Sequence, residues 1–153
     1  MYSVALATSS CLRARTRVAV VWVVDGHGLG LFDAADAIAL TPGGGRFGSL
    51  LGGALAGQLA DVANRQTSTA RLIDLEVTPV DAAVAGLGHS GPIRVVVAPA
   101  AALPERLWPL LLERQPMCLV SALDGDTLGP ARLYTADDID AAGAAIAARF
   151  REG

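Results

Sequence analysis

TPGGGRFGSLLGGALAG, residues 41–57, interleaves closely spaced glycines with apolar anchors. The anchors are Phe47, Leu50, Leu51 and Leu55. A flexible linker would carry glycine and serine without such anchors. We therefore expect a tight turn at residues 43–45, a short apolar strand, and then a glycine pair, Gly52 and Gly53, where backbone comes close to a neighbour before a helix starts.

The glycines of this stretch allow two interpretations. In the first, backbone N–H groups at the helix start after Gly53 bind a phosphate or another anion, because the first turn of a helix has unpaired donors and a positive dipole end. In the second, the stretch is a hairpin turn followed by a strand packed closely on a helix. No lysine is present to grip a phosphate, so the stretch taken alone favours the structural interpretation.

Composition and charge narrow the class of protein. A chain of 153 residues with 52% hydrophobic residues can bury a full core, which predicts one compact domain over residues 1–153. The net charge of −3 and the scattering of arginines along the sequence argue against nucleic-acid binding. All 12 basic residues are arginine, so chemistry that needs a lysine is excluded.

Neither the cysteines nor the apolar runs indicate export or a membrane span. Cys11 and Cys118 form no disulfide framework and have no metal-binding spacing. The N-terminus lacks a cationic signal followed by a long apolar core, and the longest apolar run, residues 18–24, is too short to cross a bilayer. We expect a cytoplasmic protein that makes no membrane contact.

Hydrophobic patterns predict strands that alternate with helices. The predicted strands cover residues 17–24, 37–41, 70–77, 93–97, 117–122 and 128–134, and the predicted helices cover residues 4–14, 53–65, 79–85, 103–114 and 139–151. Residues 1–16 form a lead-in, and the closing helix lies within residues 137–153. This alternation favours an α/β fold, layered, with a mixed or mainly parallel sheet and flanking helices in a single compact domain.

The only two histidines lie in glycine-rich loops, GHG after Asp25 and GLGHSG at residues 86–91. Ligands of α/β proteins gather at strand ends, so these loops are candidate site segments. His27 and His89 can bind an anion or donate a hydrogen bond to it; the alternative is an exposed loop histidine with no role. We predict no metal ligand, because no carboxylate supports the histidines, and no catalytic residue, because GHSG is not a nucleophile elbow.

Several pieces of the chain occur in a specific order. They are an apolar strand followed by DGHG, the strand IALT, the segment GRFGSLLGGALAG, the segment GLGHSGPIRVVVAP and, after a helix, PMCLVSAL. Over residues 17–123 this order resembles the N-terminal domain of the XdhC/CoxI family, accessory proteins of molybdenum-containing hydroxylases such as xanthine and carbon monoxide dehydrogenases. Each piece alone is a weak signal, whereas the shared order and spacing are specific.

The resemblance implies an accessory protein rather than an enzyme. Such a protein binds molybdenum cofactor (molybdopterin) as cargo, protects it while its terminal sulfur ligand is installed, and delivers it to an apo-hydroxylase. The implied partners are the molybdenum hydroxylase apo-enzyme and a cysteine desulfurase, and the implied assembly is a homodimer. A glycine loop suits the phosphate of the pterin, and soft thiolates suit molybdenum.

The resemblance also implies which loop residues bind the cofactor. They are Gly26, His27, Gly28, Arg46, Gly48, Ser49, Gly52, Gly53, His89, Ser90 and Gly91. Ala54 and Ala56 stand where the family's glycine-pair motif has a cysteine and a glutamate, and His89 stands at the second family cysteine, so no thiol remains at either matched position. Arg46 either pairs with a phosphate or is solvated at a hairpin tip.

Two other functional hypotheses remain open at this point. The loss of both motif cysteines also suits a degenerate copy that acts as a structural or assembly subunit of a hydroxylase without holding cofactor. A small nucleotide-binding enzyme, with residues 41–57 as its phosphate cradle, is the third hypothesis. It predicts that a nucleotide raises the melting temperature, since a ligand at about a hundred times its dissociation constant stabilises by about 2.7 kcal/mol.

Overall fold

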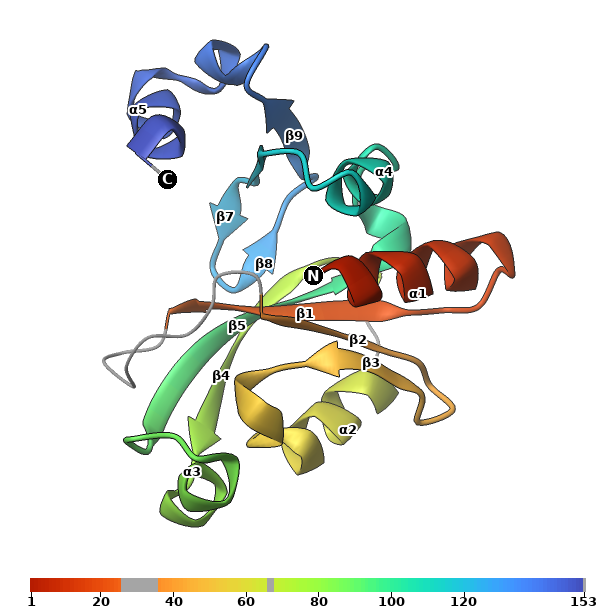
Figure 1. Ribbon diagram of the computed structural model, residues 1–153, viewed down its shortest axis with the longest axis vertical. Helices are drawn as coiled ribbons and strands as arrows, with labels where there is room; N and C mark the ends of the chain where they lie inside the picture. Colours follow the sequence, from red (N-terminus) through yellow and green to blue (C-terminus); the bar gives the residue numbers. More distant parts are fainter. Residues whose placement is uncertain (26–35, 66–67, 153) are drawn as a thin grey trace.

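A computed structural model of the chain describes residues 1–25, 36–65 and 68–152. Its strands form a seven-stranded sheet in the order β3-β2-β1-β5-β4-β8-β7 and a two-stranded sheet of β6 and β9 (Figure 1). The strands are β1 (Ala19–Asp25), β2 (Ala37–Leu40), β3 (Arg46–Ser49), β4 (Arg71–Val77), β5 (Gly91–Pro99), β6 (Met117–Val120), β7 (Leu123–Asp124), β8 (Thr127–Leu128) and β9 (Arg132–Thr135).

The prediction of a mixed or mainly parallel sheet is wrong, because all strand pairs in the described part of the chain are antiparallel. Parallel neighbours need a crossover that carries the chain back to the starting end of the sheet. Here β4 runs into the short helix α3 (Pro79–Ala85), which turns at the sheet end and returns the chain as β5. The coarser prediction, one α/β domain, is confirmed.

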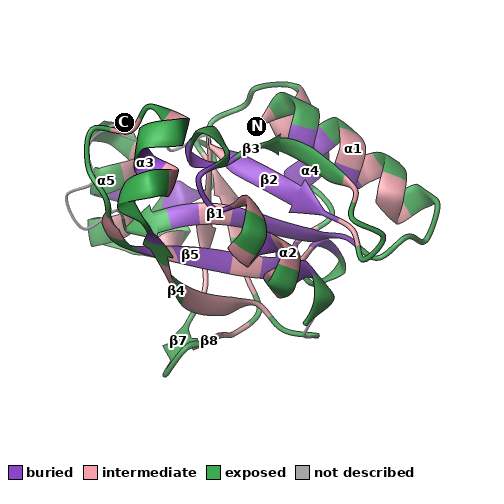
Figure 2. Cartoon of the chain, turned by 90° about the horizontal axis from the view of Figure 1, so that it is seen from below, coloured by how far each residue is buried: buried purple, intermediate pink, exposed green. Residues whose placement is uncertain are grey.

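Strand β1 is apolar along most of its length because both faces of the sheet are covered. Val20 belongs to the core cluster that includes residues of α1 (Tyr2–Arg13) and α4 (Leu107–Leu112). Val21 belongs to the cluster that includes residues of α2 (Ala56–Asn64), since neighbours in a strand point to opposite faces. Figure 1 shows α1 and α4 on one side of the sheet and α2 on the other, and Figure 2 shows β1 and β2 as largely buried.

The predicted N-terminal helix is confirmed as α1, and it is part of the core. Val4, Ala5 and Thr8 are buried, and α1 contacts α4 and the strands β2 and β3. The lead-in segment therefore covers one face of the sheet.

Proline and glycine divide two of the predicted C-terminal elements. The strand predicted at residues 128–134 is two short strands, β8 and β9, with Gly129 and Pro130 between them. The predicted closing helix is a 3-10 turn, η3 (Ile139–Ala142), followed by α5 (Ala144–Glu152), because Gly143 between them has φ of 105°. β9 and α5 lie on the side of the sheet that α1 and α4 cover (Figure 1), whereas β7 and β8 extend the sheet itself.

Candidate functional site

Two glycine-rich loops that are far apart in the sequence lie together at one end of the large sheet. The first loop leads from β3 through the 3-10 turn η1 (Leu51–Gly53) to α2. The second joins α3 to β5, whose first residue, Gly91, pairs with Val77 at the end of β4. The loops meet where η1 contacts α3: a Cβ on Gly52 would lie 3.0 Å from the carbonyl oxygen of Ala85.

The backbone of η1 is left-handed over consecutive residues, with φ of 47° at Leu51, 61° at Gly52 and 92° at Gly53. Glycine adopts such values at little cost, and the turn explains why α2 begins later than predicted, at Ala56. Leu55, which precedes α2, makes no side-chain cap. The first-turn N–H groups of α2 are therefore available as donors, which is the feature that suits a helix start to an anion.

The glycines of the first loop differ in their surroundings. A Cβ on Gly48 would lie 2.5 Å from the carbonyl oxygen of Ala37, and a Cβ on Gly52 would make a tight contact of 3.0 Å with that of Ala85. Both glycines are therefore required by packing. A Cβ on Gly53 would meet no described atom within 4 Å, so this backbone is open to an approaching ligand.

Of three polar candidates, the structure places two, His89 and Ser90, at this end of the sheet. Ser49 ends β3, and His89 and Ser90 lie in the loop before β5; all three are exposed. Ser49 pairs with Ala37 in β2, which lies level with Trp22 of β1 and Val96 of β5. His89 and Ser90 precede Gly91 at the start of β5, so Ser49 lies apart from them along the sheet. We refer to η1, the first turn of α2 and residues 86–91 as the glycine-loop junction.

Arg46 is not part of the glycine-loop junction. It begins β3 and pairs with Leu40, at the opposite end of that strand from Ser49. It lies beside the turn of residues 41–45, exposed to solvent. Gly26, His27 and Gly28 lie outside the described residues.

The positions matched to the family cysteines provide no thiol and differ in burial. Ala54 is buried, with 7% of its surface exposed, in the same core cluster as Leu55 and Leu59. His89 is exposed in the second loop. A side chain at position 54 faces the core, whereas a side chain at position 89 faces solvent.

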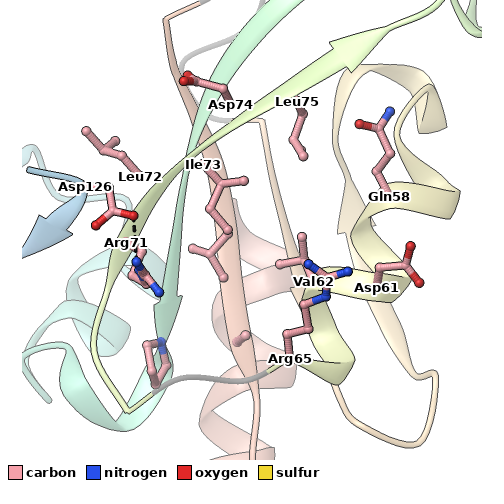
Figure 3. A pocket seen from close by; sticks show the side chains of 13 residues that line it. Gln58, Asp61, Val62, Arg65, Arg71, Leu72, Ile73, Asp74, Leu75 and Asp126 are labelled. Atoms are coloured by element: carbon pink, nitrogen blue, oxygen red, sulfur yellow. Dashed lines mark hydrogen bonds and ion pairs between the residues drawn. The ribbon is translucent and has the colours of Figure 1, made fainter.

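A groove of about 670 Å³ lies between α2 and β4, toward the other end of the sheet (Figure 3). Apolar lining comes from Val62, Ile73, Leu75 and Val97, and polar lining includes Gln58, Asp61, Arg65, Arg71 and Asp126. None of these positions was a predicted site residue. They lie in α2, β4, β5 and the turn before β8, so no local motif links them in the sequence.

Two contacts hold the walls of this groove. The Nε2 of Gln58 donates to the carbonyl oxygen of Glu76 at 2.6 Å, and the N–H of Glu76 donates to Gln58 Oε1 at 3.2 Å, which joins α2 to β4. Arg71 Nη2 lies 2.6 Å from Asp126 Oδ2, and this hydrogen bond holds the pKa of Asp126 below its ordinary value of 3.8. The described lining residues include three aspartates, Asp61, Asp74 and Asp126, and no histidine, cysteine or serine.

Metal-binding and membrane-spanning features are not found in the described ranges. Among residues 1–25, 36–65 and 68–152, no three His, Cys, Asp or Glu side chains gather in a way that would hold a metal ion. In the same ranges no helix combines the length and the apolar character needed to cross a bilayer.

Comparison with known proteins gives no family assignment. A scan against protein-family models, a search of curated proteins and a search of solved structures each found no match.

Proposed function

We propose that this chain is an accessory protein that binds molybdenum cofactor at the glycine-loop junction and assists its insertion into a molybdenum hydroxylase. The observation that supports the proposal is the meeting of η1 with the end of α3, since it joins the two glycine motifs on which the resemblance to the XdhC/CoxI family rests. Motifs that serve one ligand must lie close together in the fold, and these two do.

The residues of the junction suit one end of the cofactor and not the other. The first-turn N–H groups of α2 and the open backbone at Gly53 suit the phosphate of molybdopterin, and His89 and Ser90 supply exposed hydrogen-bonding groups for the pterin. Ala54 and His89 offer no thiolate for the molybdenum end. We therefore derive no sulfur-transfer step for this chain.

An exposed junction suits a carrier. His89, Ser90 and Gly53 all lie at the surface, so a bound molecule would remain accessible to a partner enzyme. Backbone N–H groups bind an anion without transferring a proton to it, and cargo held in this way leaves unchanged. The role proposed for these residues is to bind and orient the cofactor, with no turnover of a substrate.

The test is an anaerobic titration of the purified protein with molybdenum cofactor, followed by intrinsic tryptophan fluorescence. We expect saturable binding by the wild type, weakened about tenfold in a His89→Ala/Ser90→Ala variant, because the variant loses two hydrogen bonds to the pterin of about 0.5–1.5 kcal/mol each. Gln115→Ala, which removes an exposed side chain beyond α4, is the control and should bind as the wild type does. Absence of saturable binding by the wild type would contradict the proposal.

A second candidate function is an assembly subunit that binds the hydroxylase without holding cofactor. The observation that favours it is the burial of Ala54, which places an apolar side chain in the core where the family has a cysteine. This candidate predicts that the chain copurifies with a hydroxylase and adds no molybdenum to the complex. One further molybdenum for each bound copy of the chain would favour the carrier instead.

A further inference from the structure

An exposed hollow of about 640 Å³ lies where α1 leads into β1. Its polar lining consists of Arg15, Thr16, Arg17 and Ser68. Its apolar lining includes Leu12, Pro99 at the end of β5, and Ala101 and Ala102 of the turn η2 (Ala100–Ala102). We call this hollow the arginine hollow; it lies at the end of the sheet opposite the glycine-loop junction, because β1 begins and β5 ends there.

The charge of the arginine hollow is positive and uncompensated. Among the described residues that line it, none is an aspartate or a glutamate. In the part of the chain that the structure describes, Arg15 and Arg17 form no ion pair, whereas Arg71, Arg94 and Arg151 each do. Two guanidinium groups on either side of a threonine offer paired donors of the kind that bind a phosphate or a carboxylate.

Arg15 lies at the arginine hollow in a strained backbone conformation. Its φ is 55°, the left-handed conformation that glycine favours at the residue after a helix. The turn is held by bonds from Arg15 N–H to the Leu12 carbonyl oxygen at 3.0 Å and from Thr16 N–H to the Cys11 carbonyl oxygen at 2.8 Å. These bonds occupy two of the last carbonyl groups of α1, which reduces the negative partial charge that the helix end presents to the hollow.

We propose that the arginine hollow binds a small organic phosphate monoester, with the phosphate between Arg15 and Arg17 and the carbon part against Leu12, Pro99 and the alanines of η2. The dianionic charge of a phosphate monoester matches the two guanidinium groups. The apolar lining gives an organic phosphate an advantage over inorganic phosphate, since it removes apolar ligand surface from water. This site is separate from the glycine-loop junction and does not depend on the proposed carrier function.

An alternative explanation for a basic residue at position 15 is that its positive charge stabilises the negative C-terminal end of the α1 dipole. The chain contains a matched control for this, because Arg114 also has φ of 55° and follows α4 with the equivalent bonds. Arg114 lies outside the lining of the hollow. If both arginines only stabilise helix ends, substitution of either should have the same effect on the protein. If Arg15 binds a ligand, only its substitution should weaken ligand binding.

The test is calorimetric titration of phenyl phosphate and of inorganic phosphate into three proteins at low ionic strength. They are the wild type, Arg15→Gly/Arg17→Gln, and the control Arg114→Gly/Arg149→Gln, which loses the same charge elsewhere. Glycine at position 15 keeps the left-handed turn, and circular dichroism checks that each variant is folded.

We expect phenyl phosphate to bind the wild type and the control with equal affinity, and more tightly than inorganic phosphate. The Arg15→Gly/Arg17→Gln variant should bind about tenfold more weakly or worse, and added sodium chloride should weaken wild-type binding. No binding to the wild type, or equal binding by the two double variants, would overturn the proposal. Equal affinities for both phosphates would overturn the role of the apolar lining.

Discussion

Gly48 illustrates how one residue permits α1 to pack on the sheet. Its φ is 89°, and a Cβ at this position would lie 2.5 Å from the Ala37 carbonyl oxygen and even closer to a methyl group of Val4. Val4 is buried in α1, and Ala37 belongs to the partner strand of β3. A side chain at position 48 would therefore push the helix and the strand apart.

Replacement of Gly48 with alanine should destabilise the protein by about 2–4 kcal/mol, the sum of left-handed backbone strain and overpacking. The measurement is the free energy of unfolding in urea. Gly57→Ala is the control, because Gly57 lies within α2 and its Cβ would meet no described atom within 4 Å. The control should stabilise the protein by about 0.5–1 kcal/mol through helix propensity. Equal effects of the two substitutions would refute this account of Gly48.

Helix α3 shows that a short element can be specified by its ends. Thr78 precedes it, and the N–H of Asp81 donates to the Thr78 hydroxyl at 3.1 Å, while Pro79 occupies the first helical position. Gly86 ends the helix with φ of 70°, and the Leu87 N–H donates to the Ala82 carbonyl oxygen at 2.8 Å. These caps are local, so the sequence predicts α3 at its observed bounds.

Removal of the Thr78 cap should cost about 1 kcal/mol of stability, since the Asp81 N–H loses its acceptor. Thr78→Ala tests this, and Thr78→Ser, which keeps the hydroxyl, should remain close to the wild type. Chemical denaturation compares all three proteins. Because α3 supports η1, the alanine variant should also bind molybdenum cofactor more weakly if the glycine-loop junction is the site. A loss of stability in the serine variant as large as in the alanine variant would argue against a capping role.

At the scale of the whole molecule, the pair Arg71–Asp126 joins the β7–β8 hairpin to the edge of β4. The two side chains meet at 2.6 Å, and the N–H of Leu72 donates to the Asp126 carbonyl oxygen at 2.7 Å. The side chains are 41% and 58% exposed, so solvent screens the pair and its contribution to stability is small. The main role of the Arg71–Asp126 pair is to fix the position of the β7–β8 hairpin beside the groove.

The pH dependence of stability should report this pair. The pKa of Asp126 is lower in the folded protein than its ordinary value of 3.8 because Arg71 donates a hydrogen bond to the carboxylate. The contribution is therefore complete above the unfolded pKa and is lost as pH falls through the lower folded pKa. Urea unfolding between neutral pH and acid should show a shallower acid loss in Arg71→Gln than in the wild type, and Arg149→Gln should match the wild type. Identical acid profiles of all three proteins would contradict this.

The wrong prediction of strand direction also belongs to this scale. The run RVAVVWVV predicts a strand covered on both faces, and β1 is covered by α1 and α4 on one side and by α2 on the other. A doubly covered strand is typical of parallel sheets, but helices also cover both faces of this antiparallel sheet. Whether a connection crosses over or turns back depends on where α3 docks, and no short window of sequence carries that information.

The sequence was sufficient for features whose cause is local. The apolar run of β1 and the caps of α3 follow from side-chain alternation and from hydrogen bonding over a few residues. The tertiary structure was needed for features whose cause is long-range. It determined the antiparallel sheet, the contact of Gly52 with Ala85, and the position of Arg15 and Arg17 beside Pro99. Each of these depends on packing between segments that are distant along the chain.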